Sequence, residues 1–187
     1  MKMCSMAAGS FALTMAFAAI AADVGGVKLD DKTNVGGQEL VLNGAGIRTR
    51  AVFKVYVGSL YVPAKTANLE GVLAREPRRI QLNLLRDLSG DQLSDAVNDG
   101  LKESNSPADV EAAKGQTEQF ISIVKAMGPL KEGSVISIDF VEGATRIGFN
   151  GASKGMVPGE AFNRALTKIW VGDNPVQPDL KKAMLGG

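Results

Sequence analysis

Two kinds of hydrophobic pattern follow one another along the chain, and their order constrains the fold more than any other feature. Segments in which every second residue is apolar come in neighbouring groups, and segments with helical spacing come in neighbouring pairs. Strands that are adjacent in sequence pair antiparallel through short turns, whereas parallel strands need a crossover. We therefore predict an α+β fold, with helices covering a sheet dominated by antiparallel strands, rather than a doubly wound parallel sheet. The strand-like segments are 27–29, 38–42, 48–62, 78–85, 135–141 and 145–149, and the helical segments are 66–74, two that start at Ser89 and Ser106, 158–170 and 178–185.

Two central helices have explicit start signals. Ser89 with Gln92 three residues later forms a capping box, and Ser106 before Pro107 places a cap ahead of a proline at the first helical position. At the other end of the domain, the short segments 27–29 and 38–42 are predicted to form an opening hairpin around a polar turn.

The segment 48–62 is rich in β-branched and aromatic residues and is predicted to be one long central strand. One parity of this segment carries Arg48, Arg50, Lys54 and Tyr56, which predicts an unusual cationic and aromatic face. A guanidinium and a phenol on that face could converge on a carboxylate, a phenolate or an enone oxygen. The alternative is that Arg48 is a solvated strand arginine.

A glycine-rich stretch at 44–46 precedes this strand. It does not fit a dinucleotide-binding fingerprint, because Thr49 stands where a third glycine is needed and a strand follows instead of a helix. We therefore predict a bend between two strands.

The first 21 residues have the features of a secretion signal. Lys2 supplies a positive start, an apolar run follows, and Ala19-Ile20-Ala21 has the small-x-small form that precedes cleavage. A membrane anchor is the alternative, but the run is shorter than the roughly 20 apolar residues that a span requires. We expect cleavage before Ala22, a domain comprising residues 22–187 without a membrane span, and a periplasmic or secreted location.

Composition excludes several classes of chemistry. The chain has no histidine, and its single cysteine, Cys4, lies inside the predicted signal. Ser-His-Asp hydrolysis, a cysteine nucleophile and the usual zinc sites are thereby excluded, so we expect neither a metal nor a cofactor. Lysine and arginine total 21 against 20 acidic residues, which provides no electrostatic footprint for nucleic acid.

Three segments carry a family resemblance. LNGAGIR (42–48), VYVGSLYV (55–62) and PDLK (178–181) resemble, in the same order, stretches of the chalcone isomerases and their fatty-acid-binding relatives. Similarity to the exported bacterial chalcone isomerase-like branch is greatest. The resemblance implies an open-faced β-sandwich, in which a large antiparallel sheet lies under a layer of helices with a ligand cleft between them.

The resemblance also implies roles for particular positions. Arg48 corresponds to the arginine that places or polarises the substrate, and Tyr56 to the catalytic threonine, which is a tyrosine in the fatty-acid-binding branch. Leu93 and Gly100 occupy the places of a catalytic tyrosine and asparagine, and Ile169 falls near a threonine that contacts substrate. The polar groups of the enzyme are therefore missing at these three positions.

We accordingly predict a protein that binds a small apolar carboxylate or phenolic ligand, with Arg48 and Tyr56 holding the anion and an apolar cleft taking the tail. Loss of polar groups at Leu93 and Gly100 is expected to enlarge that cleft. The rival prediction is an isomerase, acting as an intramolecular lyase on a chalcone-like enone, in which Arg48 polarises the carbonyl and Tyr56 donates a proton. A partner-binding module is the third class.

Overall fold

The computed structural model describes residues 22–187, so the predicted signal peptide at 1–21 lies outside the described residues. A small hairpin of β1 (Ala22–Val24) and β2 (Val27–Leu29) opens this part of the chain. Seven further strands form one sheet: β3 (Lys32–Val35), β4 (Gln38–Arg50), β5 (Phe53–Val62), β6 (Arg78–Leu84), β7 (Val135–Val141), β8 (Ala144–Phe149) and β9 (Ala152–Pro158).

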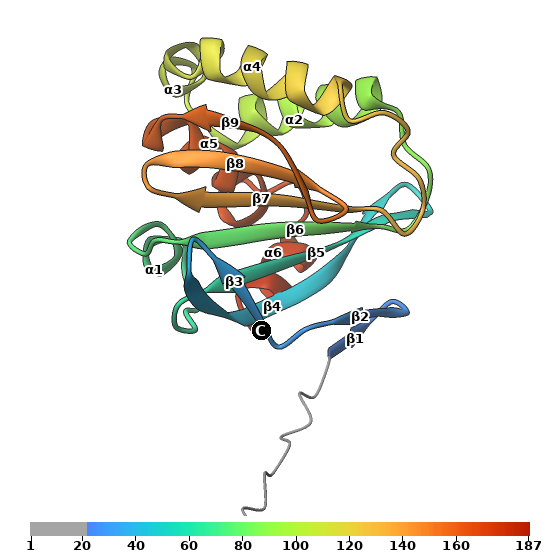
Figure 1. Cartoon of the computed structure of the whole chain (residues 1–187). Coiled ribbons are helices and arrows are strands. Elements are labelled where there is room, and N and C mark those ends of the chain that lie inside the picture. Colours follow the sequence, from blue (N-terminus) through green and yellow to red (C-terminus); the bar gives the residue numbers. More distant parts are fainter. Residues whose placement is uncertain (1–21) are drawn as a thin grey trace, which may run out of the picture.

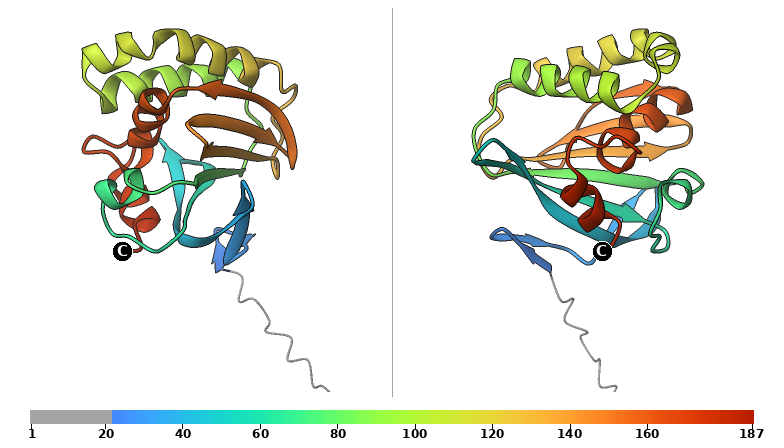
Figure 2. Two further views of the ribbon diagram at one scale, coloured as in Figure 1. Left: turned by 60° about the vertical axis from the view of Figure 1, so that its left-hand side comes forward. Right: turned by 180° about the vertical axis from the view of Figure 1, so that it is seen from behind.

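The spatial order of these seven strands is their order in the chain, and every neighbouring pair is antiparallel (Figure 1). The helices are α1 (Leu69–Leu73), α2 (Gly90–Ser104), α3 (Pro107–Ala112), α4 (Lys114–Lys125), α5 (Glu160–Val171) and α6 (Pro178–Met184). Helices α5 and α6 lie against one face of the sheet (Figure 2), α2 packs on α5, and α4 packs on α2. The predicted α+β class with a helix-covered antiparallel sheet is confirmed.

The two faces of the sheet carry different kinds of side chain. The face toward the helices carries the main core, where Leu60, Leu82 and Ile138 meet Phe120 and Phe162 with almost no exposed surface. Burial of apolar side chains such as these is the dominant stabilising contribution to folding.

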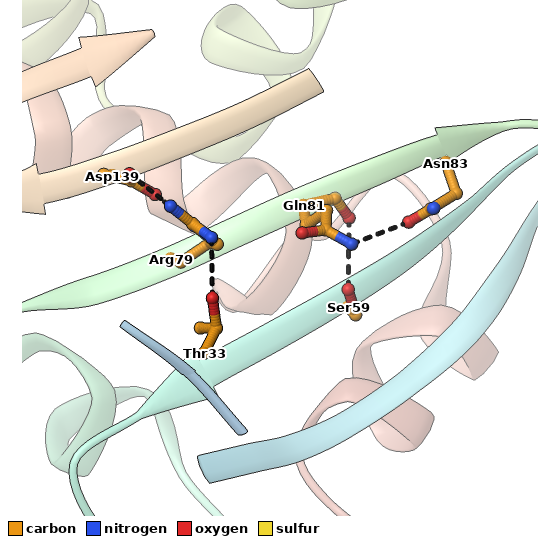
Figure 3. A network of polar contacts seen from close by, with 6 residues as sticks. All are labelled: Thr33, Ser59, Arg79, Gln81, Asn83 and Asp139. Atoms are coloured by element: carbon orange, nitrogen blue, oxygen red, sulfur yellow. Dashed lines mark hydrogen bonds and ion pairs between the residues drawn. The ribbon is translucent and has the colours of Figure 1, made fainter. Parts of the chain in front are cut away.

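The opposite face carries a network of polar side chains (Figure 3). Arg79 on β6 forms a two-pronged ion pair with Asp139 on β7 and donates to the Thr33 hydroxyl of β3 over 2.8 Å. Gln81 donates to Asn83 over 3.0 Å on the same face. The polar side chains on this face therefore satisfy one another through hydrogen bonds, and the large apolar core lies on the other face.

The predicted single strand at 48–62 is wrong. The chain reverses at Ala51 and Val52, so that β4 ends at Arg50 and β5 begins at Phe53. Ala51 has φ = 53°. The favoured two-residue hairpin turns need a positive φ at their first central residue, which is the position of Ala51. Because neither turn residue is a glycine, asparagine or proline, the strand-like pattern runs through the turn without a visible break.

The predicted bend at 44–46 is also wrong, since these residues lie inside β4. The glycines instead allow helix α6 to approach the strand. A Cβ at Gly44 would lie 2.1 Å from the Ala183 carbonyl oxygen, and one at Gly46 would lie 2.8 Å from the Ala183 Cβ. Glycine within a strand commonly marks such a close approach of another backbone.

Smaller differences concern the ends of elements. The segment 38–42 pairs with β3, not with 27–29, and β3 itself begins inside the predicted polar turn. The helix predicted from Ser106 is divided at Ala113 into α3 and α4. Strand β9 was not predicted, and the helix expected from Pro158 begins at Glu160. The capping box of Ser89 and Gln92 is present with both of its hydrogen bonds.

Candidate functional site

A cavity of about 510 Å³ opens between one end of the sheet and helices α2 and α5. Its volume lies in the usual range for small-molecule sites. Apolar side chains form most of its inner wall: Val55 from β5, Leu82 from β6, Leu93 and Val97 from α2, and Ile169 from α5. Such a wall suits an aliphatic or aromatic group.

Arg48 and Tyr56 stand opposite each other at this end of the sheet. They are register partners in the antiparallel pair of β4 and β5, and both side chains line the cavity. A bulge between Arg48 and Thr49 shifts the register by one residue just before the turn. The structure thus brings the two predicted ligand-binding residues together across neighbouring strands rather than along a single strand.

The Tyr56 hydroxyl is held by helix α5. The indole Nε1 of Trp170 donates to this hydroxyl over 2.9 Å, and both side chains are buried. Burial raises the pKa of Tyr56 above its ordinary value, although the indole hydrogen bond and the nearby charge of Arg48 act in the opposite direction. The phenol is therefore neutral near pH 7 and retains a proton that it can donate.

Gln177 fixes the position of Arg48. Its Oε1 accepts from the Arg48 Nη1 over 3.2 Å and from the backbone N–H of Thr49 over 2.9 Å. The Gln177 Nε2 donates to the Ile47 carbonyl over 3.1 Å, so one side chain clamps three successive residues of β4. Arg48 Nη1 also donates to the Thr49 carbonyl over 2.6 Å.

Donor groups remain unused on both residues. Among residues 22–187, the close hydrogen bonds of Arg48 come from Nη1, and the guanidinium also lies near enough to the Tyr56 hydroxyl to lower the pKa of that phenol. Tyr56 receives a hydrogen bond from Trp170 and donates none to the protein. An oxyanion within reach of both side chains would receive charge-assisted hydrogen bonds, which are shorter and stronger than neutral ones. This arrangement can hold a carboxylate at one end of an apolar cavity.

The rim of the cavity carries charges of both signs. Arg50 and Arg86 lie on the side of the β4–β5 turn, and Asp99 and Glu103 lie on the side of helix α2. All four residues are exposed, so water screens them more strongly than it screens the region around Tyr56.

The family follows from comparison with known proteins. A family model described as chalcone isomerase-like matches residues 21–186. The chain belongs to the chalcone isomerase-like family. The predicted resemblance is thereby confirmed.

A solved structure shares the fold of this chalcone isomerase-like protein. It is the crystal structure of a fatty-acid-binding protein from Arabidopsis thaliana, with a TM-score of 0.66 and 14% sequence identity over 86% of this chain and 92% of that chain. Identity at this level establishes the shared fold alone. Among curated proteins, none matches the sequence.

The three other positions that the chalcone isomerase-like resemblance singled out also line the cavity: Leu93, Gly100 and Ile169. All three are buried, and none carries a polar side-chain group. The space beside Gly100 is already filled, because a Cβ there would lie 2.9 Å from the Ile169 Cγ2. Gly100 therefore lets α2 and α5 pack closely, and the expectation that its missing side chain enlarges the cavity is wrong.

Sequence reasoning missed two residues of the site in this chalcone isomerase-like chain. The helical spacing of 158–170 marks Trp170 only as part of an apolar stripe, and Gln177 lies in the connection between α5 and α6, where no periodic pattern marks it. A buried tryptophan generally needs an acceptor for its indole N–H, which is the one signal that could have pointed to Trp170.

Residues 22–187 contain neither a cluster of metal-binding side chains nor a membrane-spanning helix. No cluster of three or more aspartate, glutamate, histidine or cysteine residues there could hold a metal ion. No helix in that part of the chain has the length and apolar character needed to cross a membrane.

Proposed function

We propose that this protein binds a small apolar anion, in the first instance a fatty acid, in the cavity between the sheet and helices α2 and α5. Arg48 and Tyr56 hold the carboxylate, and the apolar wall takes the tail. The observation that carries the proposal is the pair of unused donors, one cationic and one neutral, side by side at one end of a cavity of about 510 Å³. The name of the similar Arabidopsis protein, a fatty-acid-binding protein, agrees with this ligand class.

The isomerase remains the second candidate because Arg48 and Tyr56 could also polarise and protonate an enone. The composition of the cavity wall favours a binding protein over an isomerase. Leu93, Gly100 and Ile169 carry no side-chain donor, so the inner wall at these three positions offers nothing to stabilise a developing enolate.

Co-purification followed by native mass spectrometry tests the proposal. A fatty acid or similar anion is expected to accompany the wild-type protein and to be lost from Arg48→Ala. The matched control is Arg146→Gln, which removes a partly exposed arginine outside the cavity lining and should keep the ligand. If the wild-type protein carried no ligand and cyclised a hydroxychalcone faster than buffer does, the binding proposal would be wrong and the isomerase would be supported.

Export is a second part of the proposal. We propose that residues 1–21 direct secretion and that the chain works in the periplasm or outside the cell. Fractionation of expressing cells, followed by mass determination of the soluble product, should give a protein that begins at Ala22. A product that retains Met1 and stays in the cytoplasm would contradict this part without affecting ligand binding.

A further inference from the structure

The β4–β5 turn is an exposed apolar tip. Val52 is 85% exposed and Phe53 is 57% exposed, and within residues 22–187 the only other large hydrophobic residue of comparable exposure is Met156 on β9. Isolated exposed apolar residues are common on protein surfaces. Val52 and Phe53 are consecutive and lie at the end of the β4–β5 hairpin, where they form a small apolar surface.

Cationic residues surround this tip. Arg50 and Lys54 flank it in sequence and are exposed, and the Arg86 guanidinium lies 4.8 Å from the centre of the Phe53 ring. The sequence has no acidic residue between Glu39, near the start of β4, and Glu70, so the turn end of the hairpin is positively charged although the chain carries a formal charge of only +1. The acidic rim residues Asp99 and Glu103 lie on the α2 side of the cavity mouth. An apolar tip within a positive collar complements an anionic surface that has an apolar interior.

The tip lies at the mouth of the cavity. Arg50, Phe53 and Arg86 are part of the cavity lining, whereas Val52 and Lys54 are not. A surface that contacts this tip would therefore also adjoin the opening through which a ligand enters. A ligand with a long apolar tail partitions into a bilayer rather than into water, which makes a bilayer its natural source.

We infer that the tip formed by Arg50, Val52, Phe53, Lys54 and Arg86 docks on an anionic lipid surface and places the cavity mouth against it. A second copy of this chain is a poorer occupant, because a two-fold contact through the tip would set the same cations against each other. The biological reason for docking, delivery of the ligand to the cavity, rests on the proposed function. Docking itself can be measured without any ligand.

The decisive variant is the double substitution Val52→Ser with Lys54→Gln. Both residues are exposed and outside the cavity lining, so the fold and the affinity for a dissolved fatty acid are expected to stay unchanged. The matched control is Met156→Ser with Lys114→Gln, which removes one exposed apolar residue and one exposed lysine away from the tip.

The experiment is co-sedimentation of the protein with vesicles of phosphatidylcholine, with or without phosphatidylglycerol. The wild-type protein is expected to bind the anionic vesicles more tightly, and added salt should weaken that binding. The double variant should lose about fivefold or more in partitioning, since each basic residue near an anionic surface contributes about that factor. The control should bind like wild type.

Each outcome separates docking from ligand binding. If the wild-type protein does not prefer anionic vesicles, or if the double variant partitions as wild type does, the docking inference is overturned even when fatty-acid affinity in solution is normal. If anionic vesicles capture the protein through the tip while no fatty acid binds in solution, docking stands and the proposed ligand fails.

Discussion

The indole Nε1 of Trp170 donates a hydrogen bond to the hydroxyl of Tyr56 over 2.9 Å, from helix α5 to strand β5. This contact uses one acceptor site of the phenol and leaves its proton free for a ligand. It also joins the helix layer to the sheet at the point where the cavity lies, so the contact contributes both to stability and to the site.

Removing the hydroxyl should therefore lower stability. In Tyr56→Phe the buried indole N–H loses its acceptor, and an unsatisfied buried donor costs about 1–3 kcal/mol. Urea unfolding should show a loss of that size. The double variant Tyr56→Phe with Trp170→Phe should be more stable than the sum of the two single changes predicts, and strict additivity would contradict the coupling.

Gln177 is expected to act as a positioning residue for Arg48. In Gln177→Ala the guanidinium loses one of its two acceptors, so its orientation toward the cavity is less well fixed. Affinity for a fatty acid should fall several-fold, while affinity for the primary alcohol of equal length should stay nearly constant. If both affinities fell equally, the effect would be a general disturbance of the cavity and not the loss of carboxylate placement.

Alkaline pH should destabilise the protein through its tyrosines. The chain has two, Tyr56 and Tyr61, and burial raises the pKa of each above 10. Above pH 10 the unfolded chain loses these protons while the folded protein keeps them, so the free energy of unfolding falls as pH rises toward the folded-state pKa. Arg78 acts in the opposite sense, because burial lowers its pKa to about 10.

Comparison with Tyr56→Phe isolates the phenol at that position. The wild-type protein should lose more stability than the variant as pH rises above 10, and the ultraviolet signal of tyrosinate should appear only above that pH. Ionisation of both tyrosines with an ordinary midpoint near 10 would contradict this prediction.

A second buried polar cluster lies beneath helix α5. Arg78 is 2% exposed, donates to the side-chain oxygen of Asn163 and lies 4.3 Å from the centre of the Phe140 ring. Asn163→Leu would leave a buried cation without this acceptor, which should cost about 1.5–3 kcal/mol in the free energy of unfolding. The neighbouring change Arg164→Gln breaks an exposed ion pair with Glu160 and removes a positive charge that repels the Arg78 cation, so it should cost less than about 1 kcal/mol. Equal effects would contradict the assigned role of Asn163.

The sequence predicted the class of fold because its signals are local. Alternation in 78–85 and 135–141 and the capping box at Ser89 each depend on residues close in sequence, and all three are present in the structure. Antiparallel pairing of successive strands then follows from short connections.

The errors arose where tertiary packing overrides local signals. Ala51 and Val52 form a turn without turn residues, and Gly44 and Gly46 serve the approach of α6, which a pattern within β4 cannot reveal. Strand β9 at the sheet edge is largely exposed and lacks a clear alternation. At the site, the cationic and aromatic pattern of 48–62 and the family resemblance both indicated Arg48 and Tyr56. Nothing in the sequence indicated Gln177, because its contacts are with residues about 130 positions away.

The most direct test is calorimetric titration of one saturated fatty acid into the wild-type protein and into Arg48→Met with Tyr56→Phe. Hydrogen bonds to a charged group contribute about 1.5–3 kcal/mol each, so the double variant should bind at least about a hundredfold more weakly. Native-like circular dichroism of the variant is the necessary control. Equal affinity in the two folded proteins would contradict the claim that Arg48 and Tyr56 hold the carboxylate.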